Sequence, residues 1–363
     1  MMERQTKLPN EDVKKYLQEL SREYEFRYMF EGEKFGLVNN LNLLKYPVLM
    51  LAPENDSEKY KGKMRLWAYG GSIAIIDSET GHIAFSKESR DYIPYLCDGF
   101  RNNKRFPEEF WQEGLFEKLD MPANVKYERL LKMHDKCSGR INPELLDLSV
   151  FAAYTRYLNR SEYKTYPTYP QEKSIQCIIA KNSMLNSVYK DGERSMVVID
   201  VETHLFSEGG KHPRADYIVF DGTSFGLVEF KYLGESMDSK TNSLRKHYDD
   251  FEKAIKPQVG RELFEQLKMK LSYLLAYGLI DISWQEKGRE FLNRDYDASL
   301  LWYGFYFLGD RSDISGKYKD IVGDRISKQL MPVIDRESVR FQISDIRPDC
   351  IDEIKMDKTG LDI

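Results

Sequence analysis

The sequence predicts an α/β fold in the C-terminal half, with a mixed central sheet flanked by helices, and an N-terminal α+β domain. Helical and β-type segments alternate after residue 168, as is typical of a sheet covered by helices. Residues 298–309 (ASLLWYGFYFLG) are almost wholly apolar, which favours a central strand buried on both faces. The chain has 363 residues, a length at which two domains are the natural expectation.

The N-terminal half combines segments with helical patterns and segments with β-strand patterns. Residues 8–30 have helical spacing, and residues 107–158 are predicted to be mostly helical. Between them, residues 46–52 and 63–89 are β-like, with a turn at Gly70-Gly71, which predicts a small sheet or meander.

A break rich in Tyr and Pro separates the halves. Pro167 and Pro170 interrupt any regular element there. We therefore expect an N-terminal domain over 1–165, with a recognition, regulatory or assembly role, and a second domain over 166–363.

The second domain has a clear order of elements. A helix is expected first, then three strands, two helices and a closing strand. Their predicted ranges are 171–189, 195–206, 213–221, 225–232, 241–256, 260–279 and 298–309. The two middle strands are separated only by the short turn at Asp221-Gly222.

Composition bounds the class of protein. Hydrophobic residues make up 41% and charged residues 31%, as expected of a soluble globular chain. The net charge of −5 argues against a protein coated in positive potential, but a local basic groove can still sit on an acidic body.

The chain carries no indication of secretion or membrane insertion. Its four cysteines are scattered without a CxxC pair, which favours reduced thiols over structural zinc or disulfides. The charged N-terminus lacks an apolar signal region. We expect a cytoplasmic protein with no membrane partner.

Charges interrupt the two middle strands. Asp216 lies near the start of the first, and Glu229 and Lys231 near the end of the second. The strand period of two places Glu229 and Lys231 on one face. A hairpin closed by residues 221–224 pairs Asp216 directly with Glu229. We therefore expect the three side chains to converge, the alternative being solvent-facing charges on an edge hairpin.

Such a cluster points to metal-assisted chemistry. Two neighbouring carboxylates raise each other's pKa unless a cation lies between them. Mg²⁺ takes one or two carboxylates together with water and substrate phosphate. Lys231 could then hold or help deprotonate an attacking water while the metal polarises a phosphodiester.

This arrangement resembles the PD-(D/E)xK nuclease superfamily, over roughly residues 168–310. Its pattern is an acidic residue on the second core strand and ExK on the third, matched here by Pro213 with Asp216 and by Glu229-Phe230-Lys231. The resemblance implies that Asp216, Glu229 and the Phe230 carbonyl bind Mg²⁺ or Mn²⁺, and that Lys231 orients the water. It also implies DNA rather than RNA as substrate, self-association, and a role in phage defence or restriction.

Two other ExK tripeptides lack this context. Residues 162–164 lie in the Pro/Tyr break without an apolar strand, and residues 353–355 follow Asp349 too closely for a strand and a turn. Only the set around Glu229 has acid, strand, turn, strand and ExK in order.

Acidic residues nearby are weaker candidates. The superfamily often completes its metal site with a Glu from the helix before the first strand, which suggests Glu172; the helix macrodipole alone also favours Glu there. Asp200, Glu202 and His204 alternate onto one face of the first strand. Glu202 is the candidate metal ligand among them, and the alternative is a solvated strand face.

Basic and polar residues nearby have two interpretations. His212 and Arg214 could contact phosphates, or could neutralise Asp216 or Glu202. The cluster of Lys240, Arg245, Lys246 and His247 is interpreted as a solvated helix face, and Gln266 as an ordinary surface residue.

We therefore expect a metal-dependent nuclease whose N-terminal domain recognises a substrate feature or a partner protein. The main alternative is a non-catalytic nuclease-fold protein used for binding or assembly. A third is an interaction module in which the charged hairpin is incidental.

Overall fold

The computed structural model divides the chain into two compact units, residues 1–54 with 58–177 and residues 55–57 with 178–363, and each is described by itself. The predicted boundary at 165/166 lies outside the described residues and stays a prediction. The structure describes residues 15, 49–53, 63–68, 71–77, 80, 82–87, 139–140, 176, 180, 183, 188–189, 192–193, 196–210, 212–232, 243–310, 317–330, 332–333 and 339–346.

The first unit contains an antiparallel sheet in the order β1-β2-β3-β4-β5, which confirms the predicted meander. Its strands are β1 (Leu49–Pro53), β2 (Lys63–Ala68), β3 (Gly71–Asp77), β4 (His82–Phe85) and β5 (Gly139–Arg140). Apart from Lys15 and β5, the predicted helical stretches 8–30 and 107–158 lie outside the described residues. The two residues of β5 were predicted as helix, and pairing with β4 makes them a strand instead.

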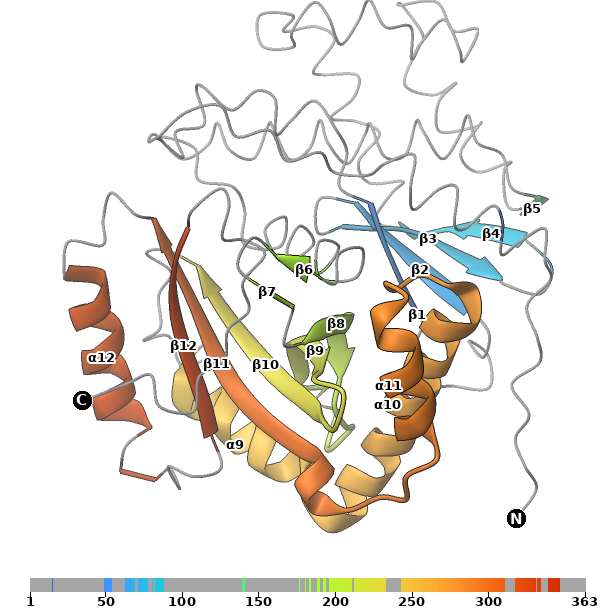
Figure 1. Cartoon of the computed structure of the whole chain (residues 1–363). Coiled ribbons are helices and arrows are strands. Elements are labelled where there is room, and N and C mark those ends of the chain that lie inside the picture. Colours follow the sequence, from blue (N-terminus) through green and yellow to red (C-terminus); the bar gives the residue numbers. More distant parts are fainter. Residues whose placement is uncertain are drawn as a thin grey trace, which may run out of the picture. The chain divides into compact units, whose positions relative to one another are not determined.

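The second unit is built on a mixed five-stranded sheet in the order β12-β11-β10-β9-β8 (Figure 1). The hairpin β6 (Val188–Tyr189) and β7 (Gly192–Glu193) precedes it, where the sequence predicted the end of a helix. The sheet strands are β8 (Val197–His204), β9 (Arg214–Phe220), β10 (Phe225–Tyr232), β11 (Leu301–Asp310) and β12 (Val339–Ile346). The first three are antiparallel neighbours, and β11 and β12 run parallel to β10.

The turn between β9 and β10 sets their register. The Asp221 carboxylate accepts hydrogen bonds from the backbone N–H groups of Thr223 and Ser224, at 2.9 and 2.8 Å, and Gly222 supplies the φ of 89° that the turn requires. The first pair after the turn is Phe220 with Phe225, the register predicted from the sequence.

Helices connect β10 to β11 and cover one face of the sheet. These are α9 (Leu244–Ala254), α10 (Pro257–Tyr277) and α11 (Ser283–Leu292). Phe225 of β10 has ring contacts with Phe264 of α10 and Phe291 of α11, and Phe251 of α9 packs against Phe305 of β11. In Figure 1, α9 lies behind the strands. This aromatic core fixes the helices on the face that also carries Glu229.

The elements after β11 were not predicted from the sequence. Helix α12 (Lys317–Gln329) leads to β12, so β11 is an interior strand rather than the end of the series. Its burial from Leu301 to Phe307 confirms the prediction made from its apolar text. No helix in the described part of the chain is long and apolar enough to span a membrane.

The register of β10 with β11 can be tested at a close contact between these two strands. A Cβ added at Gly226 would lie 2.3 Å from the Trp302 ring, so we expect Gly226→Ala to cost about 3 kcal/mol in the free energy of unfolding. Gly323 of α12 has nothing within 4 Å of such a Cβ, and Gly323→Ala should stabilise by about 0.5–1 kcal/mol. Urea denaturation followed by tryptophan fluorescence compares the two, and equal stabilities would contradict the β10–β11 packing.

Candidate active site

Strands β9 and β10 separate from each other where the charged residues lie, and we call this position the fork. The β9–β10 ladder ends at the pair Tyr217–Val228, after which β9 stays paired with β8 and β10 with β11. The next position in this register places Asp216 opposite Glu229, one on each side of the fork. Opposed residues of an antiparallel pair project from the same face. The structure thus brings Asp216, Glu229 and Lys231 to one face, as the sequence predicted.

Glu229 is buried and its carboxylate has two partners. Lys231 Nζ lies 2.5 Å from Oε1, and His247 Nδ1 lies 3.0 Å from Oε2. Burial acts to raise the pKa of Glu229, but the Lys231 ammonium and His247 outweigh it and hold that pKa below its ordinary value. Glu229 is therefore an anion in the folded protein.

Asp216 is in the opposite electrostatic situation. It is partly buried, and its Oδ2 accepts a hydrogen bond of 2.8 Å from the backbone N–H of Phe230. Burial raises its pKa well above the ordinary value, and the Glu229 carboxylate raises it further, against the lowering effect of Lys231. A positive charge beside Asp216 and Glu229 would relieve this repulsion.

Glu202 places a third carboxylate beside Asp216, on the neighbouring strand β8. It lies between two residues of β8 that pair with Tyr217 and Ala215, and is thus opposite Asp216. Its φ of 52° makes it the only non-glycine with positive φ among the described residues, and such strain often accompanies functional positions. Its carboxylate lies 3.4 Å from Arg214 Nη1, so in this structure Arg214 is a charge partner of Glu202.

Asp200 does not lie on a solvated face, which was one interpretation of the sequence. It is buried, its Oδ2 lying 2.6 Å from Lys270 Nζ of α10 and 2.5 Å from the Thr203 hydroxyl. The ion pair fastens α10 to the irregular part of β8, next to Glu202. Because both charges are paired, we assign this contact a structural role.

His247 is a site residue that the sequence analysis missed, because it was interpreted as part of a solvated face. His247 contacts Glu229 because it lies on the face of α9 that packs against the sheet. The buried residues of α9 include Leu244 and Phe251, which lie three before and four after His247 and hence on the same side of the helix. That spacing was the available signal, and the charged neighbours of His247 obscured it.

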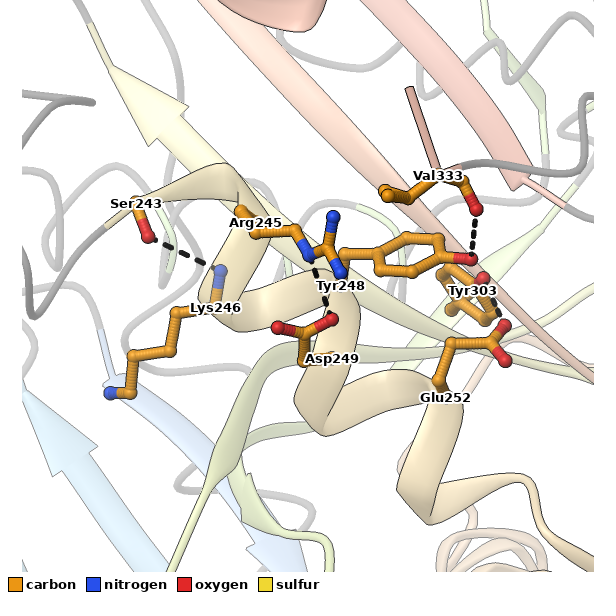
Figure 2. A network of polar contacts seen from close by, with 8 residues as sticks. All are labelled: Ser243, Arg245, Lys246, Tyr248, Asp249, Glu252, Tyr303 and Val333. Carbon is orange, nitrogen blue, oxygen red and sulfur yellow. Dashed lines mark hydrogen bonds and ion pairs between the residues drawn. The ribbon is translucent and has the colours of Figure 1, made fainter. Parts of the chain in front are cut away.

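Polar contacts on the rest of α9 hold it in place (Figure 2). The Ser243 hydroxyl caps its first turn by accepting from the Lys246 N–H at 3.2 Å. The Tyr248 hydroxyl donates to the Val333 carbonyl at 3.0 Å, and the Tyr303 hydroxyl of β11 donates to Glu252 at 2.5 Å. The helix that carries His247 is thus tied to β11 and to the segment before β12.

The remaining predicted residues lie apart from this cluster or outside the described residues. His212 is exposed, with its Nδ1 2.9 Å from the Ser207 hydroxyl and its ring 5.6 Å from that of His204. Gln266 is half-buried on α10. Glu172 and Lys240 lie outside the described residues, so their assignments stay predictions.

The oxygen donors around the fork suit a hard divalent ion. No group of three or more His, Cys, Asp or Glu placed to hold a metal occurs among the described residues. The Asp216 and Glu229 carboxylates are two oxygen donors at the fork, and Mg²⁺ needs only one or two carboxylates from the protein. The resemblance implies the Phe230 carbonyl as a third donor, and the N–H of the same residue donates to Asp216 Oδ2.

Comparisons of the whole chain with known proteins found no family model, curated protein or solved structure that matches it.

Proposed function

We propose that this protein is a metal-dependent nuclease that hydrolyses phosphodiester bonds of nucleic acid. The observation that carries the proposal is the meeting of Asp216, Glu229 and Lys231 on one face at the β9–β10 fork. Asp216 lies on β9 and Glu229 and Lys231 on β10, the second and third strands of the sheet in chain order, which is the pattern on which the resemblance to the PD-(D/E)xK superfamily rests.

Asp216, Glu229 and the Phe230 carbonyl are the proposed ligands of Mg²⁺ or Mn²⁺, with Glu202 and Glu172 as further candidate ligands. Such an ion, when bound, would polarise the scissile phosphate and lower the pKa of a bound water. The chain's own contribution is a pre-organised site, since Glu229 is fixed from two sides and Asp216 is held by the backbone of β10.

Lys231 is the proposed orienting residue for the attacking water. Its ammonium lies beside Glu229 on the same face, so a small movement of this flexible side chain transfers it from Oε1 to a neighbouring water. From there it can donate a hydrogen bond to the nucleophile and stabilise the charge that develops on it.

The proposed substrate class rests on exposed basic side chains and on the resemblance to the PD-(D/E)xK superfamily. Half of the Arg214 side chain is exposed, so it could contact a phosphate, as could the exposed His212. DNA is proposed over RNA, and phage defence or restriction as the setting, from the resemblance alone. Self-association and a partner protein for residues 1–165 belong to the same proposal.

One observation favours a second function, that of a non-catalytic binding or assembly module. Both Glu229 oxygens already have protein partners, Lys231 and His247, so the charge of Glu229 is balanced without a metal. A nuclease fold that has lost turnover could keep such an ion pair for stability.

The discriminating experiment is cleavage of supercoiled DNA, linear DNA, single-stranded DNA and RNA with Mg²⁺ or Mn²⁺. We expect cutting of one class that is abolished by EDTA and by Glu229→Gln, because the ligand charge is lost. Glu290→Gln, which changes an exposed carboxylate of α11, is the matched control and should cut like the wild type.

The outcomes separate the two functions. No cutting of any substrate, together with a melting temperature indifferent to Mn²⁺, would reject the nuclease proposal. That result would favour the binding module, whereas clear stabilisation by Mn²⁺ without cutting would point to an enzyme that awaits an activator or partner.

A further inference from the structure

His247 contacts Glu229 from a different element than Lys231 does. Its Nδ1 lies 3.0 Å from Glu229 Oε2, and its side chain is 16% exposed. An ionised carboxylate can only accept hydrogen bonds, so Nδ1 carries the proton and donates it to Oε2. This fixes the orientation of the imidazole.

The proposed function places different demands on the two partners of Glu229. It requires Lys231 Nζ to leave Oε1 for a water. His247 is on a capped helix that is tied to β11 and to Val333 (Figure 2). When Lys231 leaves, His247 is the partner that remains on the carboxylate.

We propose that His247 is a positioning residue that holds Glu229 in its ligand geometry through the Nδ1–H to Oε2 hydrogen bond. This inference rests on the proposed function, because it concerns the same carboxylate. Residues that donate to a ligating carboxylate fix its rotamer and lower the cost of binding a metal.

The second ring nitrogen offers a competing role. His247 Nε2 is buried, and no hydrogen-bond partner for it occurs in the described part of the chain. If Nε2 were the functional atom, for instance toward substrate, the Nδ1 contact would be incidental. Two conservative variants separate these roles, because the Asn amide nitrogen reproduces the position of Nδ1 and the Gln amide reaches that of Nε2.

The experiment is titration calorimetry of the full chain with Mn²⁺. We expect His247→Ala to weaken Mn²⁺ binding by about 10–100-fold, as is typical for partners of metal ligands. His247→Asn should recover most of the affinity, and His247→Gln should not. Lys246→Ala, which changes an exposed neighbour in α9, should leave the affinity unchanged.

Wild-type affinity in His247→Ala, or rescue by Gln but not by Asn, would overturn the inference while leaving the nuclease proposal intact. Absence of Mn²⁺ binding in the wild type would instead overturn the proposed function and, with it, this inference.

A metal-free measurement tests the contact itself. The chain has five histidines, so comparing imidazole ¹⁵N spectra of the wild type and His247→Asn isolates the signals of His247. We expect a protonated Nδ1. A ring protonated only at Nε2 would contradict the donation to Glu229, whatever the outcome of the metal titration.

Discussion

Replacing Lys231 by Met is expected to lower the cleavage rate by about 10²–10³-fold, the usual effect of removing one donor that stabilises developing charge. Mn²⁺ affinity should stay the same or rise, because the Lys231 ammonium lies 2.5 Å from Glu229 Oε1 and competes with any cation for that oxygen. A loss of rate with retained metal binding is the expected result for a residue that orients the nucleophile rather than the metal.

Single-turnover cleavage and Mn²⁺ titration of the same preparation measure both effects. Lys253→Met is a matched control, since Lys253 is exposed and pairs with the exposed Glu208 rather than with Asp216 or Glu229. Cleavage by Lys231→Met at the wild-type rate would exclude Lys231 from the chemistry. A parallel loss of Mn²⁺ binding would make it a structural residue instead.

Asp216→Asn is expected to raise the melting temperature of the metal-free protein at neutral pH and to remove its stabilisation by Mn²⁺. Burial and the Glu229 carboxylate raise the folded-state pKa of Asp216 above its unfolded value. For such a group, folding stability is greatest below the unfolded pKa and falls as pH rises through the folded pKa. The Asn side chain carries no charge and therefore avoids the free-energy cost of ionising a buried carboxylate beside Glu229. Its amide oxygen still accepts the hydrogen bond from the Phe230 N–H.

The pH dependence and a second variant sharpen this prediction. The advantage of Asp216→Asn should vanish toward pH 3, where Asp216 is protonated in both states, since the unperturbed pKa of Asp is about 3.9. Glu229→Gln should have the opposite sign at neutral pH, because it leaves the buried Lys231 without its anion. Melting curves over pH measure both, and destabilisation by Asp216→Asn would contradict the account of the fork.

Local chemistry explains why the sequence was sufficient to predict that Asp216, Glu229 and Lys231 lie together. The register of β9 and β10 follows from the turn at Asp221-Gly222, which lies between the strands it joins. Because that turn is short, it also determines that Asp216 is opposite Glu229. Alternation along β10 then places Lys231 on the same face.

Contacts between distant segments were beyond this reasoning. The ion pair of Asp200 with Lys270 joins residues 70 positions apart, and the position of His247 against Glu229 depends on how α9 docks on β11. The positive φ of Glu202 and the register shift between Val198 and Asp200 in β8 are backbone features that no residue pattern marks. The strand β12 was missed because it lies beyond the segment that the resemblance covers.

The most direct test of the central claim is anomalous diffraction from crystals of the full chain soaked in Mn²⁺. We predict an anomalous peak in contact with the Asp216 and Glu229 carboxylates, with Lys231 Nζ displaced from Glu229 Oε1. A fork with no Mn²⁺ peak at saturating concentration and an unbroken Lys231–Glu229 ion pair would contradict the account.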